Sequence, residues 1–342
     1  MEVMELTPVR QIERKPVIQP YKEIEEAQAV DFDVIAGHSK QFIEANTKEV
    51  SLQHLKSDCV IPVFSKDNEI TISHVTFIET VFEATSKIFP RERINVPEIR
   101  VSHIIKGRTP NAVHKSVQEL TDADKTLYYE RMAFVMEIPT IHEDISGNTL
   151  NLTIGGVRAY NHENLYSKKT FEKFKVFIGF KNMVCCNLCV STDGYKEEIR
   201  VMSRLELLQQ VISLFQSYNA SRHLQLMNSF NRHSLTEHQF AQLAGKARLY
   251  QYLPAKEKRQ LPALDFTDSH LSIIARNFYR DEAFSRNGQN AISLWNVFNL
   301  FTGANKSSYI DTFLNRSVNA TDFIFGISQA INGNSSYKWF IE

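Results

Sequence analysis

The hydrophobic pattern of this chain changes character at Asp193-Gly194, and that change constrains the fold more than any single motif. Before it, VPEIRVSHII, RMAFVMEIPTIHEDI, NTLNLTIGGVRAY and FKVFIGF are rich in β-branched and aromatic residues, as strands are. After it, SRLELLQQVISLFQSY, TEHQFAQLAGKARLYQYL, TDSHLSIIARNFY and AISLWNVFNLF carry apolar residues at helical spacing. A strand-rich half followed by a helix-rich half predicts an α+β fold rather than an alternating α/β fold.

We expect a sheet-rich region over about 55–195 packed with a helix-rich region over about 200–335. Residues 1–35 carry eight acidic and four basic side chains with poor apolar periodicity, which predicts a loosely ordered N-terminal arm over 1–40. The remaining chain divides into a mixed sheet-rich region, 41–195, and a helical region, 196–342, packed as one compact unit.

Several local signals place individual elements. CVIPVF and EITISHV predict strands, TFIETVFEATSKIF a helix, and NAVHKSVQEL a short helix. The turn Ser146-Gly147-Asn148 predicts a β-hairpin. Three later helices have starts at which a side-chain oxygen can bind the free amides of the first turn. These starts are Ser203 before Glu206, Thr236 before Gln239, and Asp268.

Charge and hydropathy exclude several classes of protein. The 39 basic and 39 acidic residues cancel, which argues against an acidic DNA mimic and against a uniformly basic chromatin-like binder. The start, MEVMELTPVRQIERK, lacks the apolar core of a signal peptide. No run approaches the roughly 18 apolar residues that span a bilayer. We therefore expect a cytoplasmic protein with no membrane partner.

The segment NLFTGANKSSYIDTFLNR, 299–316, superficially resembles a phosphate-binding Walker loop. Asn305 stands where the motif requires the second glycine, Leu300 where it requires the first, and the preceding residues are helical rather than a strand. We expect a joint between two helices instead, with Gly303 or Asn305 in the left-handed conformation. In this interpretation Ser307 or Ser308 caps the second helix. A weaker possibility is an anion site, because a helix start with hydroxyls and a cation can hold a phosphate. Its candidate residues are Lys306, Ser307, Ser308 and Arg158.

Motifs for metal, cofactor or nucleophilic chemistry are incomplete. Cys186-Asn187-Leu188-Cys189 has the spacing of half a zinc site, but no second pair of ligands follows. We expect buried free thiols, with Cys185 and Cys189 on one side of a strand and Cys186 on the other. The sequence has no Gly-x-Ser-x-Gly elbow, no HExxH and no glycine-rich dinucleotide turn. We therefore assign no metal ligand, no cofactor and no catalytic residue. Gly155-Gly156 indicates a strand bend or bulge with a close backbone approach.

Two stretches combine cations with aromatic residues, as single-strand nucleic-acid binding requires. They are LYSKKTFEKFKVFIGFK, 165–181, and KARLYQYLPAKEKR, 246–259. The alternative is that the aromatic rings are core and the lysines a solvated face. The predicted contacts are Lys168, Lys169, Lys173, Lys175, Lys246, Arg248, Lys256, Lys258 and Arg259, with Arg108, Arg131 and Arg158 as weaker candidates.

Six segments in order resemble one bacterial family of domains of unknown function, number 3871 in that series, which occurs in Bacteroides-type genomes and their mobile elements. They are EIRVSHIIKGRTPNAVHK, KTLYYERMAFVMEIP, LTIGGVRAYNHENLY, FKVFIGFKNMVCCNLCVSTDG, LTEHQFAQLAGKARLYQYLP and LWNVFNLFTGANKSSYIDTFLNR, and the resemblance covers roughly 50–342. The order of a Cys-Asn element and a later Trp-containing helix is distantly similar to a phage/plasmid-like family. The resemblance implies a mobile-element setting and transfers no catalytic residues.

These observations predict a non-enzymatic accessory protein of a phage, plasmid or integrative element that binds nucleic acid, in particular single-stranded DNA. The first alternative is a protein-interaction module whose partner is a host or phage protein, such as an inhibitor of host defence. The second is an enzyme acting on a phosphate-bearing substrate, which requires Lys306, Ser307 and Asp311 to converge with Arg158 or Arg131 in a cleft.

Overall fold

The computed structural model describes residues 41–59, 71–112, 114–162, 171–333 and 336–342. The predicted arm at 1–40, residues 60–64 of the predicted strand CVIPVF and the proposed contacts Lys168 and Lys169 lie outside these ranges.

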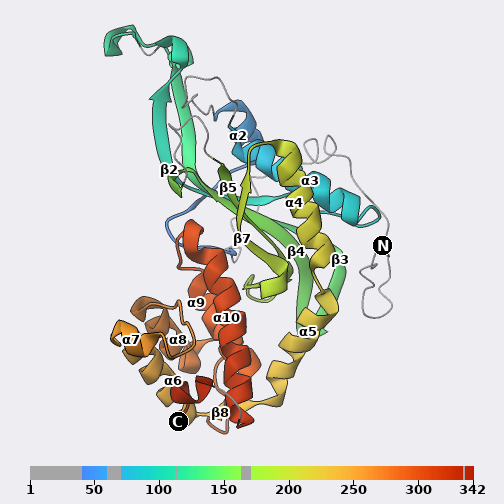
Figure 1. The fold of residues 1–342 in the computed structure, drawn as a ribbon, viewed down its shortest axis with the longest axis vertical. Coiled ribbons are helices and arrows are strands. Elements are labelled where there is room, and N and C mark those ends of the chain that lie inside the picture. Colours follow the sequence, from blue (N-terminus) through green and yellow to red (C-terminus); the bar gives the residue numbers. More distant parts are fainter. Residues whose placement is uncertain (1–40, 60–70, 113, 163–170, 334–335) are drawn as a thin grey trace.

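A seven-stranded antiparallel sheet occupies the first half of the chain (Figure 1). The strand order is β1-β2-β3-β4-β5-β6, and β7 pairs with the N-terminal part of β5 on the same edge as β6. The strands are β1 (Lys48–Glu49), β2 (Glu98–Arg108), β3 (Lys125–Ile145), β4 (Asn148–Ala159), β5 (Glu172–Asn182), β6 (Leu188–Cys189) and β7 (Tyr195–Val201). A small sheet pairs β8 (Ser234–Thr236) with β9 (Ala291–Ser293) in the second half.

Helices dominate the second half, so the α+β prediction is confirmed. The helices are α2 (Leu52–Ser57), α3 (His74–Ile88), α4 (Arg204–Ser217), α5 (Ala220–Ser229), α6 (Glu237–Tyr250), α7 (Ala255–Lys258), α8 (Asp268–Arg280), α9 (Leu294–Asn305) and α10 (Ile310–Ile331). The predicted caps at Ser203 and Thr236 are present. The α8 prediction is off by one residue: Thr267 is the cap, and Asp268 is the first helical residue.

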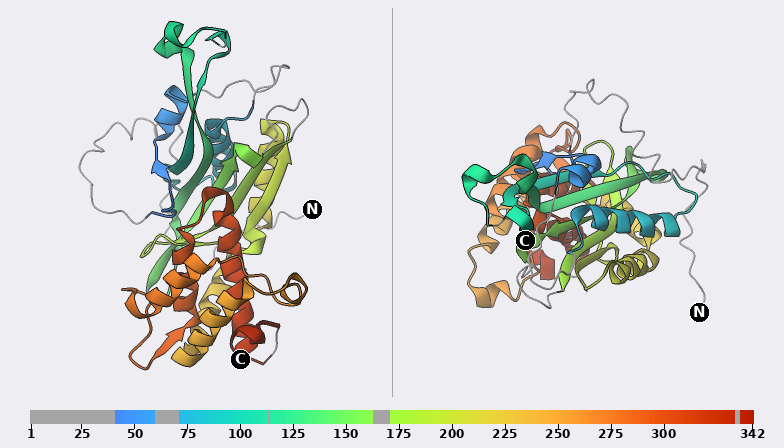
Figure 2. Two further views of the ribbon diagram at one scale, coloured as in Figure 1. Left: turned by 90° about the vertical axis from the view of Figure 1, so that its left-hand side faces the viewer. Right: turned by 90° about the horizontal axis from the view of Figure 1, so that it is seen from above.

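The sheet is buried on both faces. Successive side chains of a strand point in opposite directions, so each central strand contributes to two cores. Phe134 and Val176 face the larger core, which contains side chains of α3 and α4. Their neighbours Val135 and Phe177 face a smaller core that includes Phe313 of α10. Figures 1 and 2 show α3 and α4 together on one side of the sheet and α10 crossing the other side.

The predicted hairpin at Ser146-Gly147 is confirmed. Ser146 has φ 51° and Gly147 has φ 74°, so both residues of the two-residue turn between β3 and β4 are left-handed. This is the turn geometry that matches the twist of paired strands.

The two glycines of β4 allow close approach of neighbouring chains, as predicted, but not through a bulge. A Cβ on Gly155 would lie 2.1 Å from the main-chain oxygen of Phe134, and one on Gly156 2.5 Å from Cζ of Phe77. The register of β4 with β3 and β5 is regular at both positions. The irregular registers lie at 138/142 of β3 and 174/176 of β5.

Strands β2 and β3 extend beyond the rest of the sheet as a two-stranded ribbon (Figures 1 and 2). Its tip corrects the prediction of a helix over NAVHKSVQEL. The described part of that segment has 3₁₀ turns at Pro110–Ala112 and Val117–Glu119 instead. A capping box between Ser116 and Glu119 binds the free main-chain groups within one turn, and Leu120 is extended.

Two further local predictions are wrong. Helix α9 continues through Gly303 and Asn305, and neither residue is left-handed. A Cβ on Gly303 would lie 3.7 Å from the Asn187 side chain, an ordinary contact distance, so neither the space nor the helical backbone at this position requires glycine. In the cysteine segment only Leu188–Cys189 is strand, and Cys186 has φ 59°. The expected alternation of the three thiols along one strand therefore does not occur.

Candidate functional site

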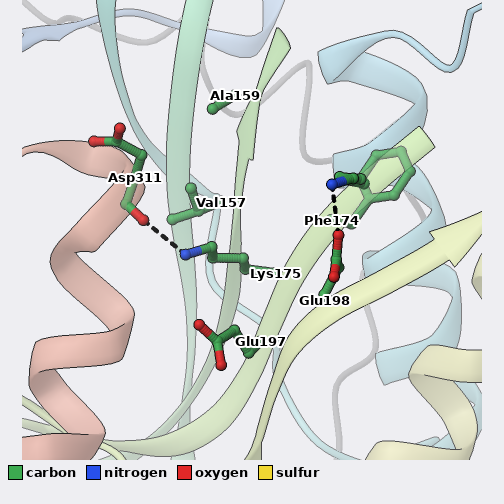
Figure 3. A pocket seen from close by; sticks show the side chains of 8 residues that line it. Val157, Ala159, Phe174, Lys175, Glu197, Glu198 and Asp311 are labelled. Atoms are coloured by element: carbon green, nitrogen blue, oxygen red, sulfur yellow. Dashed lines mark hydrogen bonds and ion pairs between the residues drawn. The ribbon is translucent and has the colours of Figure 1, made fainter. Parts of the chain in front are cut away.

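A pocket of roughly 340 Å³ opens between the sheet and the start of α10 (Figure 3). Apolar and charged side chains share its wall. The lining residues are Val157, Ala159, Lys173, Phe174, Lys175, Glu197, Glu198 and Asp311. They come from β4, β5, β7 and α10, so the pocket exists only when strands from the first half meet a helix from the second.

A register irregularity between β5 and β7 builds the acidic side of this pocket. Phe174 pairs with Ile199 and Val176 with Lys196, which leaves Lys175 opposite both Glu197 and Glu198. Consecutive residues of a regular strand point to opposite faces, whereas a bulge redirects them. Both carboxylates consequently line one pocket.

Lys175 is held firmly at the pocket wall. Its Nζ donates to the main-chain oxygen of Asp311 at 2.7 Å and to Oδ1 of Asn315 at 2.6 Å. The same Oδ1 accepts the hydroxyl of Tyr195 at 3.0 Å, and the Asn315 amide donates to Glu197. Burial lowers the pKa of the Lys175 ammonium, while nearby carboxylates oppose that shift. This network fixes the ammonium as a hydrogen-bond donor inside the fold.

The other charges at the pocket are also paired. Lys173 Nζ lies 2.7 Å from Glu198 Oε1, and hydrogen bonds from Arg200 and Lys173 lower the pKa of Glu198 to about 2. Arg131 Nη1 lies 3.6 Å from Oδ1 of Asp311. Lys173 and Lys175, two of the predicted phosphate contacts, are therefore engaged with acceptors inside the protein.

The second basic stretch lies on the helical part, in α6 and α7 (Figure 1). Leu249 is 61% exposed and Tyr252 is 77% exposed. Lys256 and Arg259 are exposed, and among the described residues neither has an ion pair or side-chain hydrogen bond. We call Leu249, Tyr252, Lys256 and Arg259 the α6–α7 surface.

The three remaining cations of this stretch each contact a neighbour. Arg248 pairs with Asp268, with a second hydrogen bond at 3.0 Å. Lys246 Nζ lies 5.1 Å from the centre of the Trp339 ring, and Lys258 Nζ lies 4.7 Å from that of Tyr250. These are cation–π distances, and at exposed sites such contacts are weak enough to rearrange on binding.

The four candidate anion-binding residues do not come together. Lys306 is 6% exposed, donates to the main-chain oxygen of Cys185 and lies 3.9 Å from Glu44. Arg158 is fully buried on the opposite face of the sheet, where it pairs with Glu172. Ser307 donates to the Ala304 oxygen at 2.7 Å.

Ser308 is buried beside His270, but the pair is not a serine–histidine dyad. The main-chain N–H of Thr267 donates to Nδ1 of His270 at 3.2 Å, so the ring proton is on Nε2. Nε2 therefore donates to Ser308 Oγ, at 3.0 Å, and cannot take the proton of its hydroxyl. Ser308 in turn donates to Asn305 at 2.7 Å. Neither serine caps α10: Tyr309 is its N-cap residue, without a side-chain cap bond.

The weaker arginine candidates are also occupied within the fold. Arg108 donates to the main-chain oxygen of Lys115 at 2.6 Å, at the tip of the ribbon. Arg131 lies next to Asp311, but of the five residues that the enzyme hypothesis names, only Asp311 lines the pocket.

Sequence reasoning missed Glu197 and Glu198, which line the pocket, and Tyr195 and Asn315, which join the hydrogen-bond network behind it. No motif marks them, because their convergence depends on one unpaired residue of β7 and on the docking of α10.

None of the described helices has the length and apolar character needed to cross a membrane.

Comparison with known proteins identifies the family. No curated protein and no solved structure matches the chain. A family model with the description "Domain of unknown function, B. Theta Gene description (DUF3871)" matches residues 23–341. Because the match spans nearly the whole sequence, the chain belongs to this family of domains of unknown function.

Proposed function

We propose that the chain binds single-stranded nucleic acid through the α6–α7 surface. The observation that supports this most directly is the exposure of Tyr252, at 77%, in the same segment as Lys256 and Arg259, which pair with no side chain in the described part of the chain. An exposed aromatic ring can stack on a base, and adjacent cations can contact the phosphates on either side. Residues 201–342 carry 14 Lys and Arg against 10 Asp and Glu, so this half is also the basic one.

The proposed interface is smaller than the sequence suggested. Lys173 and Lys175 are excluded, because their ammonium groups already bind Glu198, Asp311 and Asn315. Lys246, Arg248 and Lys258 remain secondary contacts, since their stacking or ion-pair interactions are at the surface. The setting we propose is the cytoplasm, where the protein is a non-enzymatic accessory of a phage, plasmid or integrative element.

Fluorescence anisotropy of a labelled 20-nucleotide single strand, measured over a range of salt concentrations, tests this function. Two phosphate contacts predict a slope of log affinity against log salt of about −1.4. Lys256→Ala with Arg259→Ala should flatten that slope, and Tyr252→Ala should weaken binding by about 1–3 kcal/mol. Tyr309→Ala and Lys106→Ala change an exposed ring and an exposed cation elsewhere, and should bind as the parent does. Absence of binding at low salt contradicts the proposal. So does a loss of affinity in the control variants Tyr309→Ala and Lys106→Ala as large as that in the variants of the α6–α7 surface.

A protein-interaction module is the second candidate function, and the β2–β3 ribbon favours it. The ribbon exposes Ile104 at 50% and Val117 at 76%, beyond the body of the sheet. The partner would be a host defence protein whose activity the chain inhibits. Inhibition of a defined defence enzyme that Ile104→Asp abolishes and Tyr252→Ala preserves would select this function over nucleic-acid binding.

A further inference from the structure

The C-terminal end of α2 brings a cysteine, a histidine and an aspartate together. His54 lies in the helix, Asp58 follows as its C-cap residue, and Cys59 is next. Nδ1 of His54 lies 2.7 Å from Oδ2 of Asp58. Nε2 of His54 lies 3.9 Å from Sγ of Cys59. All three are in the described part of the chain, on the opposite half of the molecule from the α6–α7 surface.

Local structure fixes the order of these groups. The Asp58 main-chain N–H donates to the His54 oxygen at 3.0 Å, which closes the last turn of α2. The hydroxyl of Ser57 donates to the other oxygen of the Asp58 carboxylate at 2.9 Å. Hydrogen bonds from His54 and Ser57 lower the pKa of Asp58, so the carboxyl group is ionised at neutral pH.

The hydrogen bond to Asp58 decides the tautomer of His54. An ionised carboxylate can only accept, so the ring proton of neutral His54 is on Nδ1 and Nε2 presents a lone pair. This is the reverse of His270, where a main-chain N–H occupies Nδ1. A histidine oriented by a carboxylate, with its unprotonated nitrogen within reach of a thiol, has the arrangement of a general base for a nucleophile.

We propose that Cys59 is a nucleophilic thiol that His54 activates as a general base, and that it takes up soft carbon electrophiles. In the step, Sγ forms a bond to the electrophilic carbon as the bond from that carbon to its leaving group breaks. The thiol proton passes to Nε2 of His54, and the leaving group departs with the electron pair. Asp58 orients the ring and stabilises the imidazolium that results.

The environment of Cys59 keeps its thiol protonated, so attack by this thiol requires a base. Burial, with the nearby Asp58 carboxylate, raises the pKa of the Cys59 thiol to about 11. The thiol therefore has its proton at neutral pH, and its reaction depends on a group that accepts the proton during attack. The side chain of His54 is 30% exposed, so reagent reaches this region from solvent.

Tyr129 competes with the thiol for the same nitrogen. Its hydroxyl lies 3.0 Å from Nε2 of His54, closer than Cys59, and is the donor to that lone pair. When the Tyr129 hydroxyl is removed, Nε2 of His54 loses this hydrogen bond and can accept the proton of the Cys59 thiol more readily. A purely structural role for His54 predicts no gain in thiol reactivity from this change.

Alkylation by iodoacetamide tests the proposal, with peptide mass spectrometry to follow each thiol in the full-length protein. Cys59 should react faster than Cys186, which is also partly exposed, and Cys189 should stay unlabelled while the protein is folded. His54→Gln should slow the labelling of Cys59 by at least about tenfold, and Asp58→Asn by a smaller factor. Tyr129→Phe should accelerate it.

Three outcomes overturn the inference. The first is a Cys59 rate no greater than that of Cys186 in the parent protein. The second is a His54→Gln variant that reacts at the parental rate while Cys189 remains protected. The third is a folded Tyr129→Phe variant in which labelling of Cys59 is unchanged or slower. Labelling of Cys189 identifies any variant that has unfolded. If a variant has unfolded, the proposal is judged on the parent protein, by whether Cys59 is labelled faster than Cys186.

Discussion

The ammonium group of Lys306 donates a hydrogen bond to the main-chain oxygen of Cys185, 121 residues earlier in the chain. The contact joins the loop between β5 and β6 to the end of α9. Beside it, the Asn187 amide donates to the main-chain oxygen of Asn299 at 3.0 Å, and that of Asn182 to Asn299 Oδ1 at 3.2 Å. The two segments with the most distinctive sequences, around the cysteines and around TGANKSS, therefore hold the two halves of the fold together.

Lys306→Met should destabilise the protein without affecting nucleic-acid binding. It removes a charged donor from a site that is 6% exposed and leaves the Cys185 oxygen without that bond. Loss of a hydrogen bond to a charged group costs about 2 kcal/mol of unfolding free energy. Urea denaturation measures the loss. Lys338→Met, at a surface position paired with Glu342, is the control and should change stability by less than about 0.5 kcal/mol.

Glu172→Gln should be more damaging than removal of both partners of its ion pair. Arg158 is fully buried, pairs with Glu172 and lies 4.6 Å and 4.4 Å from the ring centres of Tyr160 and Phe174. A buried charge that loses its partner costs about 3–5 kcal/mol, whereas apolar replacement of the whole pair is often neutral. A double variant with Arg158→Met should recover much of the lost stability in a double-mutant cycle. Additive effects of the two changes would show that the charges are uncoupled.

Stability should fall with acid between about pH 6.5 and pH 4 because of buried histidines. Burial lowers the pKa of His223 to about 4, although Asp193 opposes this shift. Above pH 6.5 the histidine is neutral in both states. Below it the unfolded chain binds a proton that the folded protein does not, which costs at most about 1.4 kcal/mol per pH unit. The loss ends near pH 4, where folded His223 also takes up a proton.

Urea titrations of His223→Gln at pH 7, 6 and 5 check this pH dependence. The variant should lose less unfolding free energy on acidification than the parent does. His238→Gln removes a histidine from an exposed position of α6 and serves as the control. Parallel curves for the parent and His223→Gln would assign the acid sensitivity to other groups.

Two glycine-to-alanine changes should shift stability in opposite directions. A methyl group on Gly155 would lie 2.1 Å from the Phe134 oxygen, and paired main chains cannot separate without breaking the β3–β4 ladder. Gly245 is an exposed position within α6, and a methyl group there meets nothing within 4 Å. Gly245→Ala should raise the unfolding free energy by about 1 kcal/mol. Thermal melts should show this gain and a clear loss for Gly155→Ala.

The fold class followed from the sequence because it depends on local periodicity. The runs of β-branched and aromatic residues in β3 and β4 and the helical spacing in α3, α4, α6 and α9 are properties of neighbouring residues, as are the Ser203 and Thr236 caps. The Ser146-Gly147 turn was predictable for the same reason. The wrong predictions, a helix at the ribbon tip and a left-handed residue at the end of α9, also concern short segments. Capping boxes end the turns at the ribbon tip, and α9 continues through Gly303 to Asn305 with helical backbone throughout.

Only the tertiary structure decided which charged residues are available. Lys173, Lys256 and Arg259 are equivalent as basic residues in the sequence, but Lys173 meets Glu198 across a bulged strand pair, whereas Lys256 and Arg259 meet solvent. The sequence alone determined that the chain has a strand-rich half and a helix-rich half, because side-chain periodicity is written into each segment. The partner of each charge depends on how separate segments pair and pack. Lys173 meets Glu198 because β5 pairs with β7, and Lys175 meets Asp311 and Asn315, more than a hundred positions away, because α10 packs on the sheet.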